Sequence, residues 1–261
     1  MSDEAWKAGG SSTNSSSAKR PRAIPAEDLG KLPSVTKVAT EVLQDLFANF
    51  GSYLLCGLGA WLVMFPVVLG GVLVTYASLL VPLLAWEDEQ LALILFLPTA
   101  FAFMVTLIVV TAPMQAGVAR ACLAWQRDGE PMGFGSSFRY ATVDVGAVIG
   151  LELLIAGMAL VGVIFCYVPA LIVSVVTSLA FPALVVHRLG AMGSLSASIE
   201  HVRKHIGWHA GFWGLGLGMV IVCQNIPVIG PFLMLPLFYS YQIRVYRQVF
   251  GDAAEPLADA A

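Results

Sequence analysis

"APMQAGVARACLAWQRDGEPMGFGSSFRYA", residues 112–141, lies between two long apolar runs. It contains Arg120, Arg127 and Arg139, whereas the apolar runs beside it hold almost no basic residue. Arginines that gather between apolar runs are typical of the loops on one face of a membrane protein. The stretch therefore predicts a loop between two membrane spans.

The composition of the whole chain supports a membrane class. Of the 261 residues, 58% are hydrophobic and 12% are charged, and the mean hydropathy is +0.80. A soluble domain is usually about a quarter charged. Because several segments run long enough without a charge to cross a bilayer, we expect an all-α polytopic membrane helical bundle.

Six transmembrane helices are predicted. The stretch 145–186 has one charge, Glu152, and as a single helix it would measure about 63 Å, twice the bilayer core. We therefore place a turn at "CYVPA" (166–170), and a second turn at "QNIPVIGP" (224–231) for the same reason. The first span, with Pro66 and Pro82 inside it, is expected to be kinked or tilted and to end before Pro82 in one alternative. The predicted spans are 52–84, 91–112, 144–165, 169–187, 210–226 and 231–247.

The basic residues suggest how these spans are oriented. All 14 Lys and Arg fall in the N-terminal segment, in two of the loops, or at the end of the last span, whereas "WEDEQ" (86–90) is purely acidic. The positive-inside rule then places both termini in the cytoplasm and the chain in the cytoplasmic (inner) membrane of a bacterium.

Three units are predicted along the chain. Residues 1–33 are polar and include "GGSSTNSSSAKRPR" (9–22), so we expect a disordered cytoplasmic tail rather than a cleaved signal peptide. Residues 34–250 form the membrane domain, and residues 251–261 are expected to be a short disordered tail.

Each pair of spans has a cytoplasmic lead-in. "SVTKVATEVLQDLFANF" (34–50) has apolar residues at Val38, Val42 and Leu46, with Glu41 and Asp45 on the other side. This spacing predicts an amphipathic helix. "SLSASIEHVRKHIGWH" (194–209) has a similar pattern, and "GEPMGFGSSF" (129–138) offers a short counterpart. We expect the two longer lead-ins to lie flat at the membrane interface.

Three stretches carry a family resemblance: "GVARACLAWQRDGEPMGFGSSF" (117–138), "FPALVVHRLGAMGSLSASIEHVRKHIGWHAGFW" (181–213) and "NIPVIGPFLMLPLFYSYQIRVYRQVF" (225–250). Over roughly residues 35–250 the chain resembles a group of bacterial six-helix membrane proteins of unknown function. That group includes the membrane domains fused to some glycerophosphodiester phosphodiesterases. The resemblance implies fold and location only, because we find no acidic or histidine cluster outside the predicted membrane region that would indicate the catalytic phosphodiesterase domain. This chain also has His187 where the group often has an Asp before Arg188.

Glu152 is the main candidate for a functional side chain, because it is the only acidic residue deep within a predicted span. Ser178 and Thr177 of span four lie at a similar predicted depth. We expect Glu152 to face inward and to donate to one of these hydroxyls. This polar site either holds the helices together or lines a transport route.

Other residue patterns have mainly structural interpretations. His201, His205 and His209 recur at a spacing that can bind zinc, but the HExxH pattern is missing, so no metal and no cofactor is predicted. The glycine stripes 207/211/214/218 and 146/150/157 are expected to be close-packing helix faces. Cys166 and Cys223 lie at the predicted outer ends of two spans. A disulfide between them is geometrically possible if these ends meet.

The leading functional hypothesis is a non-catalytic scaffold or accessory protein that binds membrane lipids or a protein partner. The alternative is a transporter or permease for a small or lipid-like solute, and an intramembrane enzyme is third. A solvated cavity that reaches Glu152 would favour transport, whereas a solid bundle would favour the scaffold. Nothing in the sequence predicts a nucleic-acid partner.

Overall fold

The computed structural model describes residues 32–86, 89–165 and 167–251, and these residues form α-helices and no strand. The predicted all-α class is confirmed. Both predicted terminal tails fall almost wholly outside these ranges, as does Cys166. The helices are α1 (Val35–Ala48), α2 (Phe50–Trp86), α3 (Glu89–Asp128), α4 (Ser136–Ala141), α5 (Val145–Ile164), α6 (Val168–Val176), α7 (Ala180–His187), α8 (Gly190–Lys204), α9 (Ile206–Gln224) and α10 (Gly230–Phe250).

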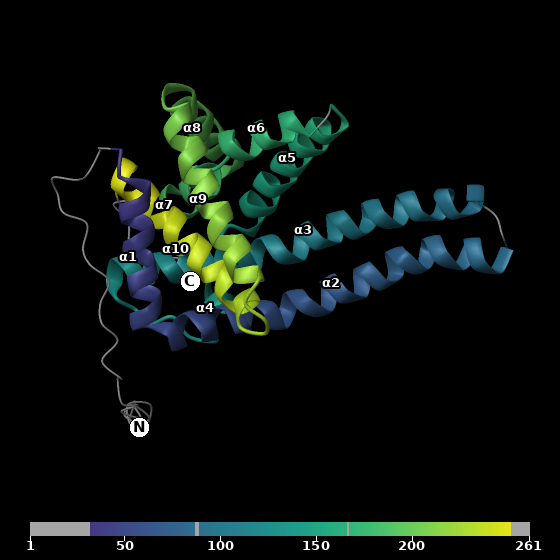
Figure 1. Cartoon of the computed structure of the whole chain (residues 1–261), viewed down its shortest axis with the longest axis horizontal. Helices are drawn as coiled ribbons and strands as arrows, with labels where there is room; N and C mark the ends of the chain where they lie inside the picture. Colours follow the sequence, from purple (N-terminus) through teal and green to yellow (C-terminus); the bar gives the residue numbers. More distant parts are fainter. Residues whose placement is uncertain (1–31, 87–88, 166, 252–261) are drawn as a thin grey trace, which may run out of the picture.

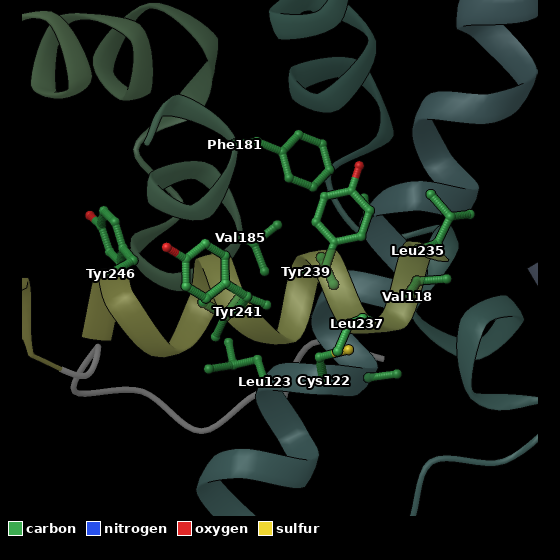
Figure 2. Packing of buried hydrophobic residues seen from close by; sticks show 14 of the residues in the cluster. Val118, Cys122, Leu123, Phe181, Val185, Leu235, Leu237, Tyr239, Tyr241 and Tyr246 are labelled. Carbon is green, nitrogen blue, oxygen red and sulfur yellow. The ribbon is translucent and has the colours of Figure 1, made fainter. Parts of the chain in front are cut away.

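Helix α10 is the centre of the fold. It is buried along most of its length and contacts α1, α2, α3, α7 and α9. Figure 2 shows Tyr239 of α10 beneath Phe181 of α7, with Cys122 and Leu123 of α3 on the other side of the helix. The rings of Tyr239 and Phe181 lie 5.1 Å apart. Both sides of α10 are therefore covered by protein.

The quoted stretch is mostly helix, which corrects the predicted loop. Helix α3 runs through Pro113 to Asp128, and nearly all its residues from Thr111 to Gln126 are buried. Only the short turn before α4 separates the two helices. The prediction was wrong because arginines between apolar runs were taken to mark a loop, whereas the guanidinium of Arg120 has partners inside the protein.

Helices α2 and α3 form a long antiparallel pair that projects from the bundle (Figure 1). At 1.5 Å per residue, α3 is about 60 Å long, twice the bilayer core. Helix α2 continues through both Pro66 and Pro82, so the alternative end before Pro82 is not adopted. The outer parts of the pair expose large apolar side chains, among them Leu73, Leu84, Ile94 and Leu97.

Five described helical segments are long and apolar enough to cross a membrane: Phe50–Ala85, Glu89–Asp128, Val145–Ile164, Val168–His187 and Ile206–Gln224. The predicted turns at 166–170 and 224–231 separate helices as expected. The predicted sixth span, α10, is not among the five. Its second half carries Gln242, Arg244, Arg247 and Gln248, all buried by protein.

The glycine stripes do not form the close contacts expected of them. A Cβ added at Gly207, Gly211, Gly214 or Gly218 would meet nothing within 4 Å, and the same holds for Gly146 and Gly157. The tight positions are elsewhere. A Cβ at Gly57 would overlap the carbonyl oxygen of Phe232, and one at Gly117 would overlap that of Ser137. Helix periodicity locates the faces that are lined by small residues. Which of these faces contacts another helix depends on how the helices pack.

Candidate functional site

The predicted lead-in helices exist, but α1 is bound more deeply than an interfacial helix. Val38, Val42 and Leu46 are buried as expected. Glu41 and Asp45 were predicted to face outward, and this is wrong. Glu41 accepts from Arg244 of α10 at 3.1 Å from Nε, with Nη2 at 3.0 Å. A charge pair removed from water in this way needs both partners to stay in place.

Asp45 is the hub of a second polar cluster. Its Oδ2 accepts from the Tyr53 hydroxyl at 2.7 Å and from Nε1 of Trp125 at 3.0 Å. Its Oδ1 accepts from the side-chain amide of Asn49 at 2.9 Å. The Tyr53 hydroxyl also lies 2.9 Å from the hydroxyl of Ser240. One carboxylate therefore ties α1 to α2, α3 and, through Ser240, to α10.

Span four is broken between α6 and α7, and a side chain from α8 fills the break. The Ser198 hydroxyl donates to the Val176 carbonyl at 2.7 Å and accepts from the Leu179 amide at 3.2 Å. A broken helix leaves backbone groups without partners, and these must be satisfied inside a membrane protein. Ser198 is almost fully buried, and no pattern in the sequence predicts this role.

The candidate functional site is the chain of polar side chains at this break. The Ser178 hydroxyl lies 3.3 Å from Nδ1 of the fully buried His209. Nε2 of His209 lies 2.8 Å from Nδ1 of His201, which is half-buried. The rings of His201 and His205 have centroids 5.1 Å apart and planes tilted by 50°. The two facing ring nitrogens of His209 and His201 must share one proton. The chain can therefore be polarised in either direction, as a proton relay requires.

The histidine cluster has hydrogen bonds rather than a metal geometry. Helix α8 ends at Lys204 and α9 begins at Ile206, so the three histidines do not lie along one unbroken helix. Within the described residues, no group of three His, Cys, Asp or Glu side chains is arranged to hold a metal ion. Burial, His205 and Lys204 all lower the pKa of His201, which favours its neutral form.

Glu152 and the two predicted hydroxyls do not form the expected contact. Ser178 has His209 as its partner, and the Thr177 hydroxyl donates to the Val173 carbonyl at 2.9 Å. Among the hydrogen bonds of the described residues, none joins Glu152 to span four. Glu152 is half-buried and lies within electrostatic range of the buried Tyr239, whose hydroxyl donates to Gln115. A functional role for Glu152 stays a prediction.

A third polar feature lies at the corner where α5 and α8 begin. The fully buried Arg120 donates from Nη1 to the carbonyls of Tyr140, at 3.1 Å, and Val143, at 2.7 Å. Its Nη2 lies 3.7 Å from Oδ2 of Asp144, and Nε of Arg188 lies 3.5 Å from the same oxygen. The arginines at 120 and 188, which the sequence suggested were loop residues, hold two helix junctions together.

Two open grooves on the surface of the described residues are both mainly apolar. One lies between α5 and α6, has a volume of about 610 Å³ and is lined by residues such as Leu154, Met158 and Val161. The other lies between α2 and α3, has a volume of about 370 Å³ and is lined in part by Val67, Val74 and Phe103. Glu152 lines neither groove.

Comparisons with known proteins give relatives but no function. The chain is 29% identical over 138 residues to the uncharacterized protein Mb2590 of Mycobacterium bovis and to the uncharacterized proteins MT2637 and Rv2560 of Mycobacterium tuberculosis. The match covers 53% of this chain and 42% of each relative, so the chain spans less than half the length of these relatives. No family model matches. No solved structure matches either.

Proposed function

We propose that this chain is a non-catalytic membrane protein that binds membrane lipid, or a protein partner, in a scaffold or accessory role. The observation that supports this most is the separation of its polar and apolar groups. The carboxylates of Glu41 and Asp45 accept hydrogen bonds from groups inside the protein, whereas both grooves are lined mainly by apolar side chains. Such surfaces suit acyl chains or other membrane helices.

The same proposal includes the topology. Helices α6 and α7 together form the fourth crossing, and α10 forms the sixth, shielded from lipid by its neighbours. Both termini then lie in the cytoplasm of a bacterial inner membrane. A reporter joined at Glu89 and one joined at Gly251 should signal opposite sides of the membrane. Signals from the same side would contradict six crossings.

A direct test of the proposed function is to extract the full chain into native nanodiscs and measure the retained phospholipid by mass spectrometry. We expect specific lipids to be enriched over the bulk membrane. A lipid profile equal to that of the bulk membrane, with no protein bound at a fixed ratio, would contradict the proposal.

The second candidate is proton-coupled transport, which the polar chain at the broken span favours. Broken helices and intramembrane ionisable groups recur in transporters. The variant His201→Gln, which interrupts this chain, separates the two functions in proteoliposomes with a pH-sensitive dye inside. If the wild-type chain carries protons and His201→Gln folds normally but does not, transport replaces the scaffold. If both are inactive and equally stable, the scaffold proposal stands.

A further inference from the structure

Two helix N-termini meet at the corner formed by Asp144 and Arg188. Helix α5 begins after Asp144, and α8 begins two residues after Arg188. A Cβ at Gly150, in the second turn of α5, would lie 3.7 Å from the Cβ of Ala191, so the first turn of α8 packs against α5 near the N-terminal end of α5. Neither helix has a side-chain cap or an acidic residue in its first turn. Free N–H groups and the positive ends of two helix dipoles therefore face this corner.

Arg120 adds donors that have no acceptor. It is fully buried, and only Nη1 is engaged with backbone carbonyls. Within the described part of the chain, Nε and Nη2 have no hydrogen-bond partner. Nη2 points to Asp144, at 3.7 Å from its carboxylate. Buried guanidinium nitrogens without partners are rare, because each such group loses its hydration without a replacement.

The carboxylate of Asp144 makes only long contacts with the two arginines at this corner. Its Oδ2 lies 3.5 Å from Arg188 and 3.7 Å from Arg120, which is longer than a charge-assisted hydrogen bond. Its carboxylate does not cap α5, its side chain is 41% exposed, and its backbone has a φ of 49°, which is unusual for a residue other than glycine. Two guanidinium groups and one carboxylate leave an excess of one positive charge.

We propose that this corner is a phosphate-binding site, formed by Arg188, Arg120 and the first turns of α5 and α8. A phosphate group would replace the Asp144 carboxylate, which turns outward, and would accept bonds from Arg188 and the helix N–H groups. Gly146 leaves the first turn of α5 open, since a Cβ there would meet nothing within 4 Å. The ligand is a phosphate ester or free phosphate. The assignment of this phosphate to a lipid headgroup rests on the proposed function. The assignment of the site itself does not.

Two titrations of the full chain in maltoside detergent micelles, which contain no phosphate, distinguish the sources. In the first, inorganic phosphate is added and the unfolding midpoint is followed by tryptophan fluorescence. In the second, phosphatidylglycerol is added to the micelles stepwise, and its ³¹P signal is also followed. A response only to the first identifies a soluble phosphate, and a response to the second identifies a headgroup. Either response supports the site.

Three variants test the assignment of residues. Arg188→Gln should weaken binding about tenfold, because it removes one charge-assisted contact. Asp144→Asn should strengthen binding about tenfold, because it removes the competing carboxylate; a merely structural Asp144 would not do so. Arg203→Gln, at an exposed position near the other end of α8, is the matched control and should leave binding unchanged.

Three results would overturn the site: no response of the wild-type chain to either probe, equal affinity in all variants, or weaker binding by a stably folded Asp144→Asn. These results are independent of the lipid proposal. Retained lipid without a phosphate response would remove the site and leave the proposed function. A response to free phosphate with neither retained lipid nor a bound protein would remove the proposed function and leave the site.

Discussion

The two halves of α3 share one helix and have opposite surroundings. From Glu89 to Val110 most side chains are apolar and at least partly exposed, whereas from Thr111 to Gln126 nearly every residue is buried. The buried half is the more polar one. It carries Gln115, Arg120 and Gln126, which bind groups on α4, on α10 and at the start of α5. The polar residues of this chain therefore mark its centre, and its most apolar segment marks its periphery.

The difference predicts that polar contacts in the core matter most for stability. Asp45→Ala removes the acceptor for Trp125 and Tyr53 and should cost about 3–4 kcal/mol, because buried donors then lack partners. The measurement is the free energy of unfolding of the purified chain in detergent. Gln44→Ala, at the exposed neighbouring position, is the control and should have little effect. A loss equal to that of the control would show that α1 is not anchored by Asp45.

The next largest effect is expected where a glycine lies in close contact with a neighbouring helix, in contrast to a glycine on an open helix face. Gly57→Ala should cost about 3 kcal/mol, because the new methyl group overlaps a backbone carbonyl of α10 that has little freedom to move. Gly214→Ala, on the open face of α9, should be neutral or slightly stabilising, since alanine favours helices. Thermal unfolding midpoints of both variants check this. Equal losses would mean that the face of α9 is covered in the membrane.

The break in span four should show an intermediate effect. Ser198→Ala leaves the Val176 carbonyl and the Leu179 amide without their partner and should cost about 2 kcal/mol. Ser198→Thr keeps the hydroxyl and should recover part of this loss. Hydrogen exchange at Leu179 should rise in Ser198→Ala alone. Unchanged exchange at Leu179 would show that the break is held by something else.

The sequence predicted much of the helix inventory but little of the polar core. Length and apolarity place a turn near Pro169 and another near Pro227, because a helix twice as long as the bilayer is thick must fold back. The same argument failed for α3, which does exceed that length, since protein rather than lipid surrounds its second half. Hydrogen bonds such as that from Ser198 to the Val176 carbonyl depend on how the helices cross. The hydrophobic periodicity of a single sequence does not predict the crossing.

Acidification should act through His201, with a smaller effect. The pKa of this side chain is lowered in the folded state from an ordinary value of about 6.5, so the unfolded chain binds the proton more strongly. The stability is therefore complete above about pH 6.5 and falls as the pH drops toward and through the lowered pKa. His201→Gln should flatten this dependence, which is measured as the free energy of unfolding between about pH 7.5 and about pH 5.5. His205→Gln, at an exposed position, is the control and should change the slope less.

The smallest effect is expected in the projecting half of α3. Leu97 is 63% exposed, so Leu97→Ala removes contacts that detergent or lipid supplies as well as protein does. It should change the free energy of unfolding by less than about 0.5 kcal/mol, whereas Leu123→Ala in the buried half should cost about 3 kcal/mol. Because both variants replace leucine by alanine in the same helix, the difference between their losses of stability reports the surroundings of the two positions. A loss for Leu97→Ala that grows with protein concentration would place a second copy of the chain against the hairpin. In that case the apolar half of α3 would be an interface between copies rather than a surface for lipid.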